Sequence, residues 1–288
     1  MHTIPCMNWR IRGRDLAIGS RSLVMGIINV TPDSFSDGGR FLHTEAAIAH
    51  ARSLVAQGAD ILDIGGESTR PGSQPVTLDE ELQRVVPVVA ALAQATDAIL
   101  SIDTSKAEVA RACLTVGAHI VNDVTGLEGD PRMAEVVRAT GAGAILMHMQ
   151  GTPMTMQIAP TYHDVVAEIC QYFTQRLQSL EIAGIGREAI AIDPGIGFGK
   201  TREHNIALLA NLSRFNALGR PICLGVSRKG FLGKLLDRPL EQRLAGSLAA
   251  AAYCLAKGSA QILRVHDVAE TRDLVRVWEV LEAQAANS

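Results

Sequence analysis

Aromatic residues are scarce in this sequence: phenylalanine, tryptophan and tyrosine together make up 4% of it, although hydrophobic residues as a whole make up 47%. Most of the buried surface must therefore come from alanine, valine, isoleucine and leucine. Branched aliphatic side chains are typical of parallel strands that are buried on both faces. The composition thus favours an α/β protein with a sizeable core.

Charge of one sign is equally scarce. The formal net charge is −3, and lysine and arginine do not cluster in any stretch. This balance argues against nucleic acid or an anionic membrane as a partner. The longest apolar run, LAGSLAAAAYCLA at 244–256, is shorter than the roughly 18 residues that a membrane span needs. We therefore expect a buried helix there.

Paired cysteines are also missing, since no two of them have the CxxC spacing. The five cysteines are Cys6, Cys113, Cys170, Cys223 and Cys254. An odd number of widely spaced cysteines argues against a disulfide framework or a zinc site. The opening stretch MHTIPCMNWRIRGRDL contains no apolar run of signal-peptide length. We therefore expect a cytoplasmic protein.

What the sequence does contain is a short apolar run followed by a helical pattern, repeated eight times. The runs are LVMGIIN, DILDIGGE, AILSIDT, HIVND, GAILMHM, AIAIDPG, ICLGVS and QILRVH. Strands that alternate with helices form right-handed parallel crossovers, and eight of them in roughly 250 residues is the number in a (β/α)8 TIM barrel. We predict a single domain over residues 1–288, with a short N-terminal β-hairpin over 1–22 and the barrel over 23–288.

Local signals mark several helix ends. Thr77 with Glu80, and Ser105 with Glu108, each match a capping box. Glycines that follow the helical patterns are predicted to end them. They are Gly58, Gly117, Gly141, Gly184 and Gly258.

Three nucleotide or metal motifs are incomplete. A doubly wound sheet is the competing architecture, but the turn after the first apolar run reads NVTPDSFSDGG and lacks GxGxxG. GIGFGKT resembles a phosphate loop, yet Gly195 and Gly199 are one residue too close for Walker A. DSFSDG begins like a calcium loop, but Phe35 stands at a ligand position and Thr44 replaces the closing glutamate.

Each apolar run ends in polar or charged residues. They are Asn29; Asp63 and Glu67; Asp103; Asn122 and Asp123; His148; Asp193; Ser227, Arg228 and Lys229; Arg264 and His266. In a closed parallel barrel these ends meet at one rim, where barrel enzymes have their active sites. Polarity resumes at any strand end, but carboxylates inside apolar text such as SIDTS and AIDPG are costly unless they have a partner. We therefore expect one site at this rim.

Eight motifs, taken in order, resemble those of the dihydropteroate synthase family of pterin-binding barrels. They are GIINVTPDSFSDGG, DIGGESTRPGS, SIDTSK, VNDVTG, MHMQGTP, DPGIGFGK, SRKGF and RVHDV, and they run from about Leu23 to Asp267. The resemblance implies a (β/α)8 barrel, as a homodimer. It also implies a transferase of folate biosynthesis that joins 6-hydroxymethyl-7,8-dihydropterin pyrophosphate to 4-aminobenzoate and releases pyrophosphate.

The resemblance implies that Asp103, Asn122 and Asp193 bind the pterin, together with Thr69 and Lys229. Two carboxylates and an amide can accept from and donate to the ring nitrogens and the amino group. A pocket built from such groups rejects a ligand that lacks their partners by roughly 10⁴-fold. Asp103 and Asp193 could instead cap loops or helices, and Lys229 taken alone would more often be solvated.

Arg264 and His266 are the residues expected to hold the pyrophosphate. The RVH spacing places both on one side of the last strand, ahead of a helix start that favours anions. An arginine fork suits phosphate oxygens better than a lysine does. The resemblance implies Asn29 as a pyrophosphate-binding residue and as the ligand of Mg²⁺, which would be held mostly by the substrate and water. His266 could also be an ordinary loop histidine.

Two loops, NVTPDSFSDGG and GGESTRPGS, would close over the site and exclude water from a pterin-methyl cation. The resemblance implies that Phe35 and Pro71 sandwich the aminobenzoate ring and that Ser227 meets its carboxylate. It implies that Asp37 holds positive charge near the cation and that Arg70 pairs with it; Lys229 completes the catalytic set. Phe35 could instead pack on the barrel rim. The first loop matches the sulfonamide-sensitive form of the family, so sulfonamides are expected competitors.

Three other interpretations stay open at this point. A pterin-binding barrel of a corrinoid methyltransferase would share the pterin pocket but would not need the pyrophosphate residues. A Schiff-base aldolase needs a lysine on a strand, where the sixth run has Asp193. A non-catalytic pterin-binding subunit would be expected to lose Arg264, His266 or the first loop.

Overall fold

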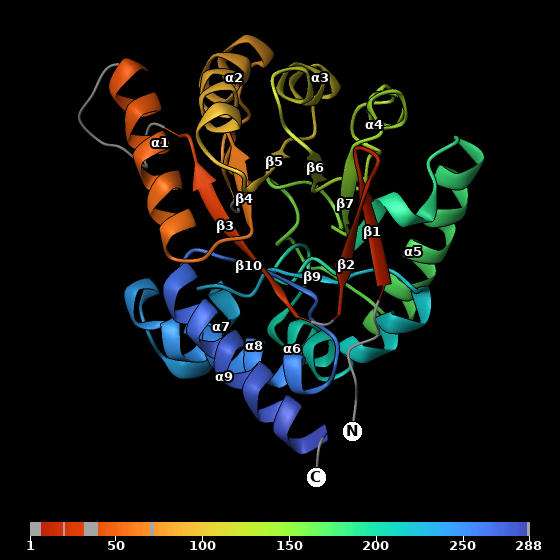
Figure 1. Ribbon diagram of the computed structural model, residues 1–288. Coiled ribbons are helices and arrows are strands. Elements are labelled where there is room, and N and C mark those ends of the chain that lie inside the picture. Colours follow the sequence, from red (N-terminus) through yellow and green to blue (C-terminus); the bar gives the residue numbers. More distant parts are fainter. Residues whose placement is uncertain (1–6, 20, 32–39, 70–71, 287–288) are drawn as a thin grey trace.

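A computed structural model describes residues 7–19, 21–31, 40–69 and 72–286 of the chain (Figure 1). Eight parallel strands form its central sheet: β3 (Leu23–Asn29), β4 (Ile61–Gly65), β5 (Ile99–Asp103), β6 (Ile120–Asp123), β7 (Gly143–Met147), β8 (Ile190–Asp193), β9 (Cys223–Leu224) and β10 (Ile262–Val265). They follow the order β8-β7-β6-β5-β4-β3-β10-β9, and a parallel bridge between Ile192 and Ile222 joins the two ends. The barrel predicted from the sequence is confirmed.

Helices surround the barrel on its outer side (Figure 1). They are α1 (Arg40–Ala56), α2 (Leu78–Ala95), α3 (Ala107–Thr115), α4 (Met133–Thr140), α5 (Val165–Ile182), α6 (Arg202–Ala210), α7 (Gly230–Leu236), α8 (Leu244–Ala256) and α9 (Val268–Ala286). Short 3₁₀ turns lie at Arg187–Ala189, Leu212–Leu218 and Leu240–Gln242. Outward strand residues such as Leu62 and Ile64 pack with Val85 and Val88 of α2 in the main core.

The amino end of the barrel is closed by an antiparallel hairpin of β1 (Met7–Ile11) and β2 (Arg14–Ile18). Trp9 of this hairpin is fully buried, and its Nε1 donates to the carbonyl of Ala189 at 2.9 Å. Trp9 packs in a separate cluster with inward residues of the strands, among them Met25 and Ile61. The predicted hairpin therefore exists and fills one end of the barrel with apolar side chains.

One of the two predicted capping residues caps its helix and the other does not. Thr77 caps α2 as expected, since its Oγ1 accepts from the N–H of Glu80 at 3.3 Å. The cap at Ser105 is wrong, because α3 begins at Ala107 and its N-cap side chain makes no capping bond. The N–H of Ala107 donates instead to Oδ2 of Asp130 at 3.1 Å, so a tertiary contact replaces the local cap. The glycines predicted to end helices all have positive φ.

The Ala-rich run is α8, and it is only partly buried. Its buried residues are Ser247, Ala251, Cys254 and Leu255, whereas Tyr253 is 47% exposed. The expected buried helix is therefore a surface helix with one face on the barrel. Among the helices of the described ranges, none has the length and apolar character needed to cross a bilayer.

Candidate active site

Side chains from four strands meet inside the barrel near the carboxyl ends of the strands. Arg264 of β10 donates from Nε to Oδ2 of Asp63 on β4 and from Nη2 to Oδ2 of Asp103 on β5, both at 2.6 Å. Asn122 of β6 donates from Nδ2 to the same Asp63 oxygen at 3.0 Å. Parallel pairing sets Asp103 beside Asn122 in the register. The barrel therefore brings together residues that are far apart in the sequence.

The ionisation of this group follows from its burial. Burial raises the pKa of Asp103 to about 7, although the nearby Arg264 guanidinium opposes the shift. Burial alone would lower the pKa of Arg264, but the carboxylates of Asp63 and Asp103 outweigh it and raise that pKa above its usual value. The guanidinium therefore stays charged at neutral pH, while Asp103 lies close to its own titration.

Asp193 and Lys229 also belong to this interior. Asp193 ends β8, is 6% exposed, and accepts the N–H of Gly195 on Oδ1 at 2.7 Å. Burial raises the pKa of Asp193, and the bond to Gly195 and the charge of Lys229 oppose it. Burial lowers the pKa of Lys229 to about 8, and its Nζ lies 4.2 Å from the centroid of the Phe198 ring. A cation beside a buried carboxylate suits a polar heterocycle.

Ser227 and His266 lie together at the rim. Ser227 is buried; its Oγ lies 3.1 Å from Nδ1 of His266 and accepts the His266 backbone N–H at 3.2 Å. β10 ends at Val265, so His266 lies in the following loop and is exposed. Arg264 and His266 follow the predicted spacing, but Arg264 bonds the interior carboxylates whereas His266 bonds Ser227.

The remaining predicted residues have different positions. Asn29 is the half-buried last residue of β3 and pairs with Gly65 in the register. Thr69 lines a cavity of about 330 Å³ that Asp103 also lines. Four predicted residues lie outside the described ranges: Phe35, Asp37, Arg70 and Pro71.

The lysine of GIGFGK, Lys200, is buried and bonded to backbone carbonyls. Lys200 is 2% exposed, and its Nζ donates to the carbonyls of Phe198 at 2.8 Å and His148 at 3.2 Å. Burial lowers the pKa of Lys200 to about 7 and that of His148 to about 3. These bonds hold the loop that follows Asp193 against the end of β7.

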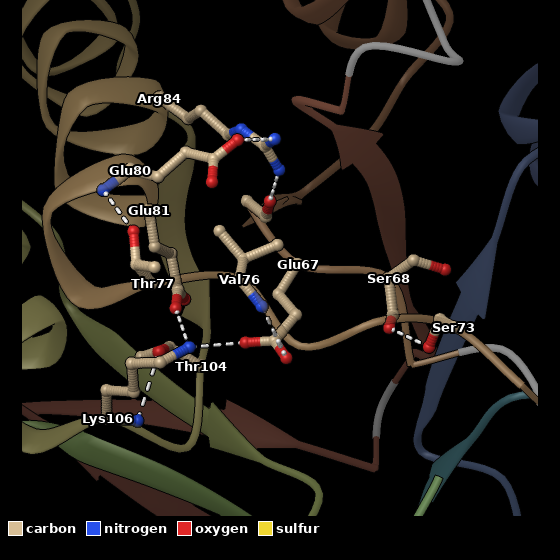
Figure 2. Close-up of polar contacts among 11 residues, drawn as sticks. Glu67, Ser68, Ser73, Val76, Thr77, Glu80, Glu81, Arg84, Thr104 and Lys106 are labelled. Atoms are coloured by element: carbon tan, nitrogen blue, oxygen red, sulfur yellow. Dashed lines mark hydrogen bonds and ion pairs between the residues drawn. The ribbon is translucent and has the colours of Figure 1, made fainter. Parts of the chain in front are cut away.

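A second polar network lies at the rim, beside the cavity. Figure 2 shows the amino group of Lys106 between the carboxylates of Glu67, in the β4–α2 connection, and Glu81 of α2. Arg84 of α2 donates from Nη1 to the carbonyl of Gly66 at 2.6 Å. Helix α2 thus fixes the start of the β4–α2 connection, which bears Thr69.

Several of these polar residues were not assigned a role from the sequence, among them Asp63, Lys106 and Glu81. Asp63 was recognised only as a polar residue at a strand end. Glu81 carried a usable signal, because it precedes Val85 by four residues and so falls on the buried stripe of α2. Lys106 carried none, since its partners come from two other elements.

Known proteins are similar to this chain over most of its length. A model of the pterin binding enzyme family matches residues 25–266. A dihydropteroate synthase of Escherichia coli strain K12 is 50% identical over 256 residues, which cover 89% of this chain and 90% of that protein. The chain therefore belongs to the pterin-binding enzyme family. Within that family it falls among the dihydropteroate synthases.

Two solved structures have the same fold. A dihydropteroate synthase of Yersinia pestis in complex with a sulfonamide drug has a TM-score of 0.90 and 45% identity, covering 96% of this chain and 100% of that one. A dihydropteroate synthase of Xanthomonas albilineans with 4-aminobenzoic acid has a TM-score of 0.90 and 46% identity, covering 97% of this chain and 99% of that one. The likeness thus extends over nearly the whole barrel.

Proposed function

We propose that the chain condenses 6-hydroxymethyl-7,8-dihydropterin pyrophosphate with 4-aminobenzoate, giving 7,8-dihydropteroate and pyrophosphate, with the pterin held between Asp103, Asn122 and Asp193. The supporting observation is that these groups meet inside one end of the barrel with Arg264 and Lys229 among them. As a dihydropteroate synthase, the chain is a transferase of folate biosynthesis.

The pterin edge finds complementary groups here. Asn122 donates its amide to Asp63, which leaves its Oδ1 to accept from a ring N–H. Asp193 uses Oδ1 on Gly195 and so keeps Oδ2 for the 2-amino group. Lys229, held beside Asp193, can donate to the pterin carbonyl region. Thr69 would contact the substrate from the β4–α2 connection.

Departure of pyrophosphate creates positive charge on the pterin-methyl group. The buried carboxylates of Asp103 and Asp193 favour such a cation, while Arg264 and His266 favour the leaving anion. Asp37 and Arg70 are proposed to assist from the two loops. The aniline nitrogen of aminobenzoate then attacks, and because an aniline is nucleophilic near neutral pH, no general base is required.

We propose that Mg²⁺ accompanies the pyrophosphate, with Asn29 as its protein ligand. Among the described residues, no group of three or more His, Cys, Asp or Glu side chains could hold a metal ion. Asn29 offers one neutral amide oxygen at the end of β3. A single amide fits a cation that phosphates and water mostly surround. When bound, Mg²⁺ would neutralise charge on the departing pyrophosphate.

Aminobenzoate is proposed to bind beside the rim, with its ring between Phe35 and Pro71 and its carboxylate near Ser227. The hydroxyl of Ser227 already lies against His266, so the proposed aminobenzoate and pyrophosphate positions adjoin. The relatives with 4-aminobenzoic acid and with a sulfonamide drug support both ligands for this chain. Sulfonamides would compete with aminobenzoate.

A homodimer in the cytoplasm is also proposed. Val277, Val280 and Leu281 of α9 have exposed fractions of 60%, 68% and 64%, and their spacing places them on one face of the helix. Such a stripe is typical of a protein–protein contact. The described cysteines are free thiols, in keeping with a reducing compartment.

The test is turnover by the purified chain with dihydropterin pyrophosphate, aminobenzoate and Mg²⁺, following pyrophosphate and dihydropteroate together. The matched pair of variants is Asp193→Asn and Asp97→Asn, because Asp97 is an exposed aspartate outside the barrel interior. We expect Asp193→Asn to lose pterin binding in calorimetry and Asp97→Asn to behave like the unmodified chain. Absence of product from the unmodified chain would refute the function, and full pterin affinity in Asp193→Asn would refute the pocket.

A further inference from the structure

We infer that Asp63 is a positioning residue for the reaction: it orients the guanidinium of Arg264 and the amide of Asn122 toward the two ends of the dihydropterin pyrophosphate. The inference rests on the proposed function. Asp63 is the third residue of β4, and its side chain is fully buried. Its register partner on β5 is Ser101, two residues before Asp103. Asp63 therefore lies one inward-facing layer, about 7 Å, below the rim carboxylate.

A single oxygen of Asp63 fixes both neighbours. Oδ2 accepts from Nε of Arg264 and from Nδ2 of Asn122. A carboxylate can only accept, so the amide nitrogen of Asn122 must face it and the amide oxygen must face away. Nε lies on Asp63 and Nη2 on Asp103, and no residue in the described ranges bonds Nη1 of Arg264, so we assign that edge to phosphate oxygens. Asp63 thus determines which edge each group offers to substrate.

The burial of Arg264 does not by itself explain why it has a second carboxylate partner, Asp63, beside Asp103. Arg220 is 8% exposed, and within the described residues its hydrogen bonds go to carbonyls alone, namely those of Ile190 at 2.9 Å and of Asn8 and Glu188 at 3.1 Å. This chain can therefore bury a guanidinium without a carboxylate bonded to it, although the charge of Glu188 acts on Arg220 from nearby. Arg264 already has Asp103, so Asp63 adds a charge that stability does not require.

The remaining oxygen of Asp63 points to the same conclusion. Within the described residues, Oδ1 is buried and has no hydrogen-bond partner. An unpaired buried carboxylate oxygen is costly, and an apolar side chain would avoid that cost. The charge of Asp63 also raises the pKa of Asp103, although burial raises that pKa more and the charge of Arg264 lowers it.

The test compares Asp63→Asn with Ser101→Ala. Ser101 is fully buried in the neighbouring strand, and within the described residues its hydroxyl has no partner, so it is a matched interior control. We expect Asp63→Asn to lower kcat/KM for dihydropterin pyrophosphate by about 100-fold. The KM for aminobenzoate at saturating pterin should stay unchanged, and Ser101→Ala should stay within about twofold on both.

The pH dependence of pterin binding is a second measurement, and it distinguishes a role of Asp63 in orienting its neighbours from a role in folding alone. Loss of the Asp63 charge lowers the pKa of Asp103, so the acidic limb of the pH dependence of pterin binding should move to lower pH. Asp63→Glu restores the charge but advances the carboxylate by one methylene. We expect it to restore the acidic limb while kcat/KM stays low. Should Asp63→Asn fail to fold, Asp63→Glu still carries the kinetic comparison.

The outcomes are distinct. An active unmodified chain with an unaffected Asp63→Asn variant would overturn this inference and leave the proposed function standing. Full recovery of kcat/KM in Asp63→Glu would mean that charge alone matters and would overturn the positioning role. An inactive unmodified chain would instead refute the proposed function.

Discussion

Two regions of the molecule each place one cation between two carboxylates. Inside the barrel, Arg264 lies between Asp63 and Asp103, whereas at the rim Lys106 lies between Glu67 and Glu81 (Figure 2). The charges are the same, but the geometry differs. A guanidinium is a planar fork that fixes direction, and an ammonium is a point charge that does not. The interior group can therefore orient groups toward a ligand, while the rim group can only tie elements together.

Exposure separates the two groups only slightly. Each has one buried carboxylate, Asp63 inside the barrel and Glu81 at the rim, and the cations Arg264 and Lys106 are 20% and 26% exposed. The second carboxylates differ more, since Asp103 is 11% exposed and Glu67 25%. Burial would lower the pKa of Lys106, but Glu67 and Glu81 outweigh it and raise that pKa, so the ammonium persists above neutral pH. The donor geometry of an ion group, more than its charges, therefore indicates what the group does.

The largest effect is expected from Arg264→Lys, which converts the interior group into a copy of the rim group. An ammonium can donate to both carboxylates, as Lys106 does at the rim, but its remaining N–H has no fixed direction and cannot form a bidentate pair with phosphate oxygens. We expect kcat/KM for dihydropterin pyrophosphate to fall by about 10³-fold. Calorimetry should show a larger loss of affinity for the pyrophosphate ester than for free hydroxymethyldihydropterin. Equal losses of affinity for the two ligands would mean that Arg264 does not bind the pyrophosphate group.

Lys106→Met should have the next largest effect, on stability. It removes the cation from Glu81, a fully buried carboxylate with one oxygen that already has no partner in the described ranges. Breaking a buried pair by removing one partner is strongly destabilising, so we expect the free energy of unfolding to fall by about 3 kcal/mol. Chemical denaturation measures it, with Lys234→Met on the exposed face of α7 as the control.

Substitutions in the two regions should also differ in their effect on kcat/KM. We expect Lys106→Met to change kcat/KM by less than about tenfold, because Lys106 holds the β4–α2 connection without orienting a group inside the pocket. A loss of activity as large as that of Arg264→Lys, with unchanged stability, would contradict the assignment of the rim network as a tether.

The sequence predicted the barrel, the hairpin and the convergence of polar strand ends because these depend on local patterns. Alternation within β4 predicts that Asp63 faces inward, yet it cannot predict that Arg264, 201 residues away, is its partner. That contact depends on the register across β4, β3 and β10. The cap at Ser105 failed for the same reason, since Asp130 reaches α3 from another connection.

The smallest effect is expected from Glu67→Gln, which is the rim counterpart of Asp63→Asn. Each variant removes one of two carboxylates and leaves a one-to-one ion pair. At the rim the lost carboxylate is partly exposed, so the free energy of unfolding should change by less than about 1 kcal/mol. Turnover should change by no more than about twofold, because Glu67 bonds Lys106 and the N–H of Val76 and, within the described residues, no proposed ligand-binding side chain. Glu135→Gln, on the exposed face of α4, is the control. If Glu67→Gln slowed turnover as much as Asp63→Asn, the two ion groups would have the same role. The distinction between an interior group that orients ligand-binding side chains and a rim group that holds the β4–α2 connection would then be wrong.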